Sequence, residues 1–166
     1  MKVVVDTNVL VSGILSVEGP PGRIVDLIIS SDLQVYFNGK ILAEYDSVFK
    51  RPELTLFGPF VTSLLTQIVA AGESVPALPI TRHLPDPTDE MFLDVALTGQ
   101  VECLITGNLK HFPPLCRRGV RVLSPREFLE FYRDQQDRSG GKVKSPSAKY
   151  RSKKRRTRSR TEQPIK

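Results

Sequence analysis

The sequence predicts a doubly wound α/β domain with a largely parallel sheet, followed by a disordered basic tail. Short apolar strands alternate with segments whose apolar residues have helical spacing, the order typical of βα units. The first strand, Val3–Val5, is apolar at consecutive positions, as expected for a strand buried on both faces. Charge marks the boundary: residues 1–137 hold 12 Lys and Arg against 17 Asp and Glu, whereas residues 138–166 hold 12 against one acid. We therefore expect one domain over 1–137, with a net charge of −5, and a separate tail over 138–166, with +11.

The first half of the chain is expected to contain two strands and three helices. After the strand that ends at Asp6, residues 9–18 are predicted to form a loop or a short helical turn. Ile24, Leu27 and Ile28 have helical spacing, so a helix of about ten residues should end at the following pair of serines. A second strand, a turn and two further helices are then predicted over residues 33–37, 38–39, 41–51 and 59–71.

The second half repeats this alternation. Asp86 followed by Pro87 is typical of a helix N-cap with proline in the first turn. Ser124 and Glu127 have the spacing of a capping box, which predicts the start of a final helix. Strands are predicted over residues 102–106 and 120–123, with a weak peripheral strand over the proline-containing residues 74–78.

The composition indicates a protein of the reducing cytoplasm. Cys103 and Cys116 lack metal-ligand spacing, and Cys103 falls in an apolar strand, as expected for a buried free thiol. No apolar run comes near the roughly 18 residues of a membrane span, and Lys2 leads into the first strand without a signal-peptide pattern. We therefore expect a cytoplasmic protein that has no membrane partner.

Acidic and amide side chains are expected to gather at one edge of the sheet. Asp6 ends the first strand, Asn108 follows a later strand, and Asp86 and Asp89 lie at a helix start. Strand ends and helix starts can share the carboxyl edge of a parallel sheet. Gathered carboxylates repel unless a cation lies among them, and oxygen ligands suit Mg²⁺ or Mn²⁺ rather than zinc. Two such ions about 4 Å apart can promote phosphodiester hydrolysis.

Each of these residues also has a structural interpretation. Asp6 and Asn8 can shape the turn after the strand, and Asp86 can act only as a helix cap. Asp89 and Glu90 can complement the helix dipole. From spacing alone, the metal-site and structural interpretations both stay open.

Four other polar residues are expected to lie outside the chemistry when taken alone. Glu44, in the middle of a helix, has the pattern of a solvated residue, and Asp94 is expected at the surface. Neither His83 nor His111 is expected to be catalytic, and His111 is expected on an exposed loop.

Four motifs, in this order, resemble the PIN (PilT N-terminus) domain. They are Val-Val-Val-Asp6-Thr7-Asn8-Val, Leu42-Ala-Glu44-Tyr, Asp86-Pro-Thr-Asp89-Glu-x-Phe-Leu-x-x-Ala96 and Leu-Ile-Thr106-Gly107-Asn108-x-x-His-Phe112. Together with the ending Val-Leu-Ser-Pro125-Arg-Glu-Phe128-Leu, they cover about residues 1–133. The chain is similar in particular to a bacterial subfamily of toxins from toxin–antitoxin systems.

The resemblance implies a three-layer α/β/α fold and a Mg²⁺- or Mn²⁺-dependent ribonuclease. By position, Asp6, Glu44 and Asp89 match the catalytic and metal-binding acids, with Asp6 and Asp89 on the principal ion and Glu44 on the attacking water. Asn108 is a departure, because many members of the family have Asp there. An amide still offers an oxygen ligand, but the site loses one negative charge, which predicts slower turnover. The auxiliary residues are Asp86, Thr106 and Asn8.

Functions of other classes remain open. A PIN-like body that no longer cuts could act as an RNA-binding or protein-interaction module, and Asn108 favours this alternative. A dehalogenase-type phosphotransferase needs Asp-x-Asp after the first strand, where this chain has Asp6-Thr7-Asn8. The acid pair of a receiver domain and the Gly-rich loop of a nucleotide-binding Rossmann protein are both absent from the sequence.

The tail has too few apolar residues to fold alone, so it is predicted to be disordered. Its basic run Lys153, Lys154, Arg155 and Arg156 suits sequence-independent contacts with the phosphates of RNA. A solvated segment without function, neutralisation of the acidic body and DNA binding are the alternatives. A cognate antitoxin and a homodimer are implied by the resemblance alone.

Overall fold

Strands and helices alternate along the chain, as predicted. The structure, a computed structural model, describes residues 1–76 and 83–138, so the predicted tail beyond Arg138 and part of the strand expected over 74–78 lie outside the described residues. The strands are β1 (Lys2–Val5), β2 (Gln34–Phe37), β3 (Glu73–Ser74), β4 (Cys103–Ile105) and β5 (Val122–Leu123). The helices are α1 (Thr7–Leu15), α2 (Pro20–Ile29), α3 (Gly39–Phe49), α4 (Gly58–Ala71), α5 (Glu90–Thr98) and α6 (Pro125–Arg138). Short 3₁₀ helices are η1 (Pro52–Phe57), η2 (Pro87–Asp89), η3 (Leu109–His111) and η4 (Pro114–Cys116).

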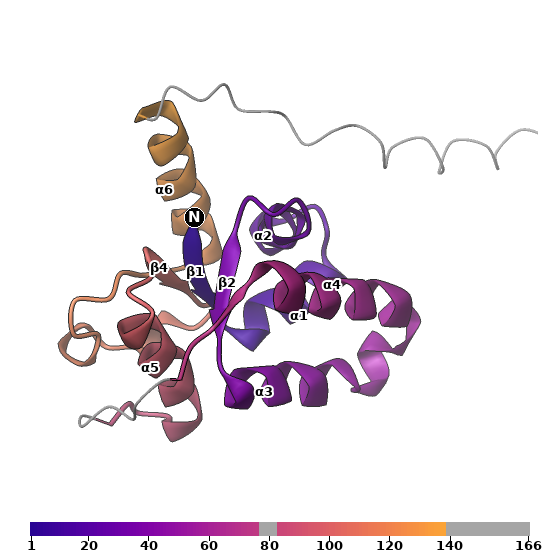
Figure 1. Ribbon diagram of the computed structural model, residues 1–166, viewed down its shortest axis with the longest axis horizontal. Coiled ribbons are helices and arrows are strands. Elements are labelled where there is room, and N and C mark those ends of the chain that lie inside the picture. The colour runs from indigo at the N-terminus through magenta and orange to yellow at the C-terminus, as the bar shows by residue number, and fades with distance from the viewer. Residues whose placement is uncertain (77–82, 139–166) are drawn as a thin grey trace, which may run out of the picture.

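The predicted central sheet is confirmed, and all its strand pairs are parallel. The strand order is β3-β2-β1-β4-β5, which places β1 in the middle (Figure 1). Val3 lies opposite Val35 of β2 and Cys103 of β4, and all three side chains are buried. The run of valines is therefore covered on both faces, which explains why β1 shows no polar alternation.

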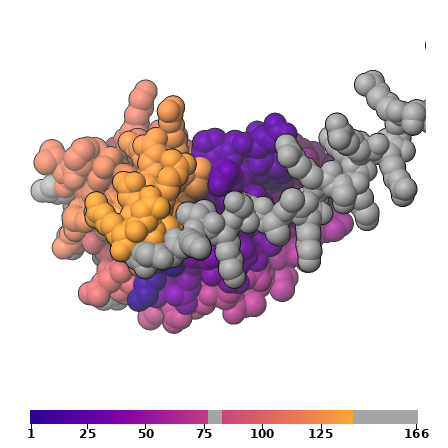
Figure 2. Space-filling view, turned by 90° about the horizontal axis from the view of Figure 1, so that it is seen from above, coloured from indigo at the N-terminus to yellow at the C-terminus, as the bar shows by residue number. Residues whose placement is uncertain are grey.

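Helices cover the sheet on both sides and complete three layers. α5 packs on β1, β2 and β4, whereas α4 packs on β2 and on α2, and α2 in turn contacts α1. Figure 1 shows α5 on one side of the strands and the group of α1, α2 and α4 on the other. α6 lies against α2, as the view from above also shows (Figure 2). The predicted three-layer α/β/α arrangement is confirmed.

Helix α1 corrects the expectation of a loop or short turn over residues 9–18. It begins directly after Asp6, whose carboxylate caps the helix by accepting a hydrogen bond from the Asn8 amide. Gly13 lies where α2 approaches, because a Cβ at this position would come within 2.6 Å of the Pro21 carbonyl oxygen. Gly13 is thus needed for the close packing of α1 and α2.

Three further expectations can be compared with the structure. Asn38 does not form a simple turn but caps α3, because its side chain accepts a hydrogen bond from the Ile41 amide. Asp94, expected at the surface, is buried on α5, so that expectation is wrong. Cys103 is a buried free thiol, as predicted.

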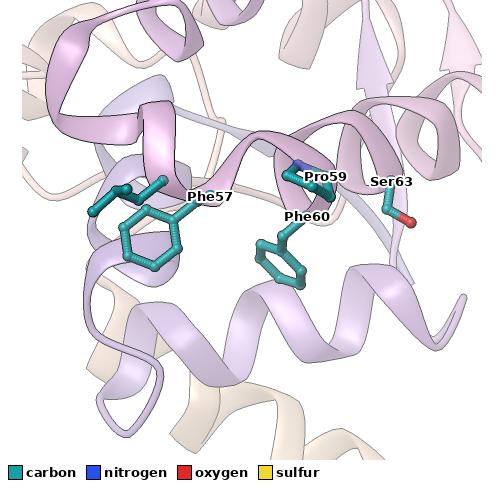
Figure 3. Close-up of a pocket in the computed structure, with 5 residues that line it drawn as sticks. Phe57, Pro59, Phe60 and Ser63 are labelled. Carbon is teal, nitrogen blue, oxygen red and sulfur yellow. The ribbon is translucent and has the colours of Figure 1, made fainter.

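One helical stretch corrects the expectation that no segment could span a membrane. Pro52–Ala71, which joins η1 to α4, has 20 residues and a mean hydropathy of 1.6, enough by length and composition alone. The core helix of a soluble protein passes the same test. One face of α4 is buried through Val61, Leu64 and Ile68, although only 22% of the apolar window is buried. Near its start, an apolar depression is lined by Leu56, Phe57, Pro59, Phe60 and Ser63 (Figure 3), none of which is a predicted site residue.

Candidate functional site

Asp6 is held in one orientation at the carboxyl end of the central strand. Its side chain is only 5% exposed. One carboxylate oxygen, Oδ2, accepts hydrogen bonds from Thr106 Oγ1 at 2.7 Å and from Asn8 Nδ2 at 2.8 Å, and Oδ1 accepts from the Asn8 amide at 3.2 Å. Burial raises the pKa of Asp6, these hydrogen bonds oppose that rise, and the charge of Asp89 adds to it. A cation beside Asp6 would relieve the cost of keeping this carboxylate ionised.

Asn8 and Thr106 connect the end of β1 to the loop after β4. The Asn8 side chain accepts a hydrogen bond from the Gly107 amide at 2.9 Å, and the Thr106 hydroxyl accepts one from the Asn108 amide at 3.0 Å. A Cβ at Gly107 would come within 3.0 Å of Asn8 Oδ1, so a side chain there would crowd this contact. The two predicted auxiliary residues therefore fix the position of Asn108 relative to Asp6.

Tyr45, which follows Glu44 on α3, contacts the same strand end, but no contact among the described residues places the Glu44 carboxylate beside Asp6 or Asp89. The Tyr45 hydroxyl donates a hydrogen bond to the carbonyl of Val5, the residue before Asp6. Burial and the charge of Asp6 both raise the pKa of Tyr45. Glu44 itself is half-buried and makes no hydrogen bond or ion pair with another described residue. Its carboxylate is therefore available to a ligand.

Asp86 has the structural role that the sequence allowed for it. It caps η2, because its Oδ1 accepts hydrogen bonds from the Thr88 amide at 2.9 Å and the Thr88 hydroxyl at 2.7 Å. These hydrogen bonds lower the pKa of Asp86. The cap also brings Asp86 close to Asp89, so capping and metal binding are compatible roles for this residue.

His111 lies within the acidic group, contrary to the expectation of an exposed loop residue. Its Nδ1 lies 2.6 Å from Asp89 Oδ2, and its Nε2 lies 2.6 Å from Asn108 Nδ2. Potential ligand atoms of Asp86, Asp89 and His111 all lie within 4.8 Å of one another, and no other group of three such residues occurs in the described part of the chain. The sequence signal is the spacing Asn108-x-x-His111, since side chains three residues apart eclipse in a 3₁₀ helix.

The residues at this edge fit a hard divalent cation. Carboxylate and amide oxygens dominate the donor set, and burial raises the pKa of Asp89 as it does that of Asp6. Next to Asp6, Thr7 Oγ1 is a buried polar atom without a hydrogen-bond partner among the described residues. A bound ion would offset the charge repulsion between the carboxylates. The predicted nucleic-acid contacts Lys153, Lys154, Arg155 and Arg156 lie outside the described residues.

Comparison with known proteins agrees with the motifs and the fold. The sequence model of the PIN domain matches residues 2–110. The chain is also 28% identical over 141 residues to an uncharacterized protein, MJ1680, of Methanocaldococcus jannaschii, an alignment that covers 78% of this chain and 90% of the relative. Because that relative is archaeal and uncharacterized, the bacterial toxin subfamily is not confirmed. PIN domains are generally metal-dependent nucleases, and this chain belongs to the PIN domain family.

Proposed function

We propose that the protein is a Mg²⁺- or Mn²⁺-dependent endoribonuclease with Asp6, Glu44 and Asp89 as its essential acids. The observation that carries this proposal is the buried Asp6 carboxylate, oriented by three hydrogen bonds and close enough to Asp89 for the two charges to interact. A structural turn residue would not need to keep a buried carboxylate beside a second acid. Such a pair is costly unless a cation binds.

In this proposal the side chains of the protein orient the metal ion and the attacking water and accept the proton of that water. A bound divalent ion supplies Lewis-acid stabilisation of the phosphate and lowers the pKa of a water molecule. Asp6 and Asp89 would hold this ion, with the Asn108 amide oxygen as a neutral third ligand. Glu44, free of other described partners, would orient the attacking water and accept its proton. The hydrogen bonds to Asp6 keep its carboxylate in place, so little reorganisation accompanies the reaction.

Basic residues near the acids support RNA as the substrate. Residues 103–126, which contain the site loop, hold five Lys and Arg and no Asp or Glu. Lys110 precedes His111, and Lys40 lies one turn before Glu44 on α3. Both lysines are exposed, and neither forms an ion pair with another described residue. They are therefore available to phosphates on either side of the cleaved bond.

The tail adds a second basic element to this proposal. Deleting residues 138–166 removes 12 Lys and Arg. The deletion is expected to weaken RNA binding at low salt and to flatten its salt dependence, because fewer counterions are released. Fluorescence anisotropy with labelled RNA over a salt series measures both quantities, and superimposable curves would exclude a role for the tail.

A role as the toxin of a toxin–antitoxin pair, with an antitoxin partner and a homodimer, belongs to the same proposal. This role is supported by the resemblance of the sequence motifs to those of a bacterial subfamily of PIN-domain toxins. The second candidate function is a PIN-like RNA-binding module without cleavage, which is favoured by the amide at Asn108 where many PIN domains have a carboxylate.

Cleavage of end-labelled RNA in Mn²⁺, Mg²⁺ or EDTA tests the proposal. Wild type should cut only with a divalent ion, and Asp6→Asn should lose about 10³-fold in rate, because metal-ion stabilisation of the transition state is worth several kcal/mol. Asp46→Asn is the matched control, since Asp46 is exposed on α3 and paired with Lys50. Circular dichroism would show that both variants fold. RNA binding without cleavage by wild type would favour the binding module, and metal-independent cleavage would contradict both candidates.

A further inference from the structure

His111 bridges two residues of the candidate site with both of its ring nitrogens. Nδ1 contacts Asp89 Oδ2 and Nε2 contacts Asn108 Nδ2, each at 2.6 Å. The Asp89 side chain is 14% exposed and that of His111 38%, so the bridge is partly shielded from water. The three residues come from η2 and η3, which are separate in the sequence and meet only in the folded protein.

The two contacts together match one arrangement of the ring proton. The Asp89 carboxylate only accepts hydrogen bonds, so Nδ1 must carry the proton that is donated to it. In the orientation that the structure gives the Asn108 amide, Nδ2 faces Nε2 and can only donate, so Nε2 accepts in this arrangement. Both contacts are satisfied together by the neutral Nδ1–H tautomer. If the Asn108 amide were reversed, its oxygen would face Nε2, and the ring would need a proton on both nitrogens.

The backbone holds this bridge against the rest of the site. The His111 amide donates to the Asn108 carbonyl at 3.1 Å, and the Asn108 amide donates to Thr106 Oγ1, which in turn donates to Asp6. Asn108 is thereby held on both sides, with its amide nitrogen toward His111 and its carbonyl oxygen left for another partner. Loss of the His111 contacts would therefore change the positions of Asp89 and Asn108 together.

The short contact between His111 and Asp89 also argues against His111 as a metal ligand. A separation of 2.6 Å is a hydrogen-bond distance and leaves no room for an ion between Nδ1 and Oδ2. The other ring nitrogen is occupied by Asn108. The ring therefore acts on the site through its two partners.

We propose that His111 is a positioning residue, which aligns Asp89 and Asn108 through the hydrogen-bond chain Asn108–His111–Asp89. This inference rests on the proposed function, because Asp89 and Asn108 are the ligands that His111 would hold in place. The proposal also explains the amide at position 108: its Nδ2 group provides an N–H toward Nε2 of His111, which a carboxylate at this position cannot do. Asn108 and His111 are thus a matched pair.

The protonation of His111 tests the chain of hydrogen bonds without reference to activity. Long-range ¹H–¹⁵N NMR spectra of the metal-free full chain should show a proton on Nδ1 of His111, the nitrogen that faces Asp89. A ring whose only proton is on Nε2 would overturn the proposal, because Nδ1 could then not donate to Asp89. Asn108→Asp removes the N–H donor, so the ¹⁵N chemical shift of Nε2 should change in this variant. An unchanged Nε2 shift in Asn108→Asp would show that Asn108 is not its partner.

Metal affinity tests whether the chain positions Asp89. His111→Phe keeps a ring but loses both hydrogen bonds, and it should weaken Mn²⁺ binding by about 10- to 100-fold in calorimetric titration, the usual cost of losing a partner that orients a ligand. The matched control is His83→Phe, because His83 is exposed and pairs with Glu90 rather than with Asp89. It should change the affinity by less than about twofold. An unchanged affinity in His111→Phe would overturn the positioning role.

The two proposals can fail separately. If the wild type bound Mn²⁺ but cut no RNA, the nuclease proposal would fail, and the tautomer and affinity would still decide the role of His111. If the wild type bound no Mn²⁺, the site would not be a metal site and the positioning role would be overturned with it. The NMR spectra would still show whether the hydrogen-bond chain forms.

Discussion

Replacing Thr106 by valine removes one hydroxyl from a fully buried position and leaves the shape of the side chain almost unchanged. This hydroxyl donates to Asp6 Oδ2 at 2.7 Å and accepts from the Asn108 amide at 3.0 Å. Thr106 has no exposed surface, so water cannot replace either contact without a rearrangement. The substitution therefore leaves a buried carboxylate with one donor fewer and an amide without an acceptor.

The expected cost follows from these two contacts. A hydrogen bond to a charged group contributes about 1.5–3 kcal/mol, and an unsatisfied buried amide costs about 1–3 kcal/mol. Because neighbouring effects do not add fully, Thr106→Val should lower the free energy of unfolding by about 3 kcal/mol. The Thr106 hydrogen bond lowers the pKa of Asp6, so the loss should grow as the pH rises through that pKa and Asp6 ionises.

Urea denaturation followed by circular dichroism measures this change. Thr106→Ser is the matched control, because it keeps the hydroxyl and loses only a methyl group, at about 0.5–1.5 kcal/mol. If Thr106→Val were no less stable than Thr106→Ser at neutral pH, the hydroxyl would not support Asp6 as inferred. Weaker Mn²⁺ binding in the valine variant alone would link the same contact to the metal site.

Two further predictions concern the surface around the site and the last helix. Lys40→Ala and Lys110→Ala should each reduce the slope of log affinity against log salt concentration for single-stranded RNA by about 0.7. Lys50→Ala is the control and should leave the slope unchanged, because Lys50 is paired with Asp46. Equal slopes in all three variants would contradict the proposal that Lys40 and Lys110 contact RNA phosphates. Glu127→Gln should destabilise the protein by about 0.5–1 kcal/mol at neutral pH, because its carboxylate caps the helix through Ser124. Those hydrogen bonds lower the pKa of Glu127 from its ordinary 4.5, so the stabilisation is present above that value and is lost as the pH falls through the folded pKa. Urea denaturation at neutral and acidic pH should show that the destabilisation by Glu127→Gln becomes smaller as the pH falls. A destabilisation that does not change with pH would contradict the proposed role of the carboxylate.

Interactions within a few residues are the part of this protein that the sequence predicts well. The valines of β1 indicate a strand buried on both faces, and the Ser124–Glu127 box indicates where α6 begins, because both signals depend on neighbours in the chain. The position of Asp6 at a strand end likewise places it at the carboxyl edge of a parallel sheet. The motifs that resemble the PIN domain add the hypothesis that Glu44 and Asp89 act together with Asp6.

Contacts between distant segments were decided only by the tertiary structure. Gly13 allows α2 to pack closely on α1, and Asp94 is buried because of the way α5 packs on the sheet. His111 appears to be an ordinary loop residue in the sequence, since its partner Asp89 lies 22 positions away. The sequence by itself determined the buried strands of the sheet and the caps at Asp86 and Ser124, because these follow from short-range periodicity and capping. Only the fold decided which polar groups meet at that edge, because a hydrogen bond depends on distances that neighbouring residues do not set.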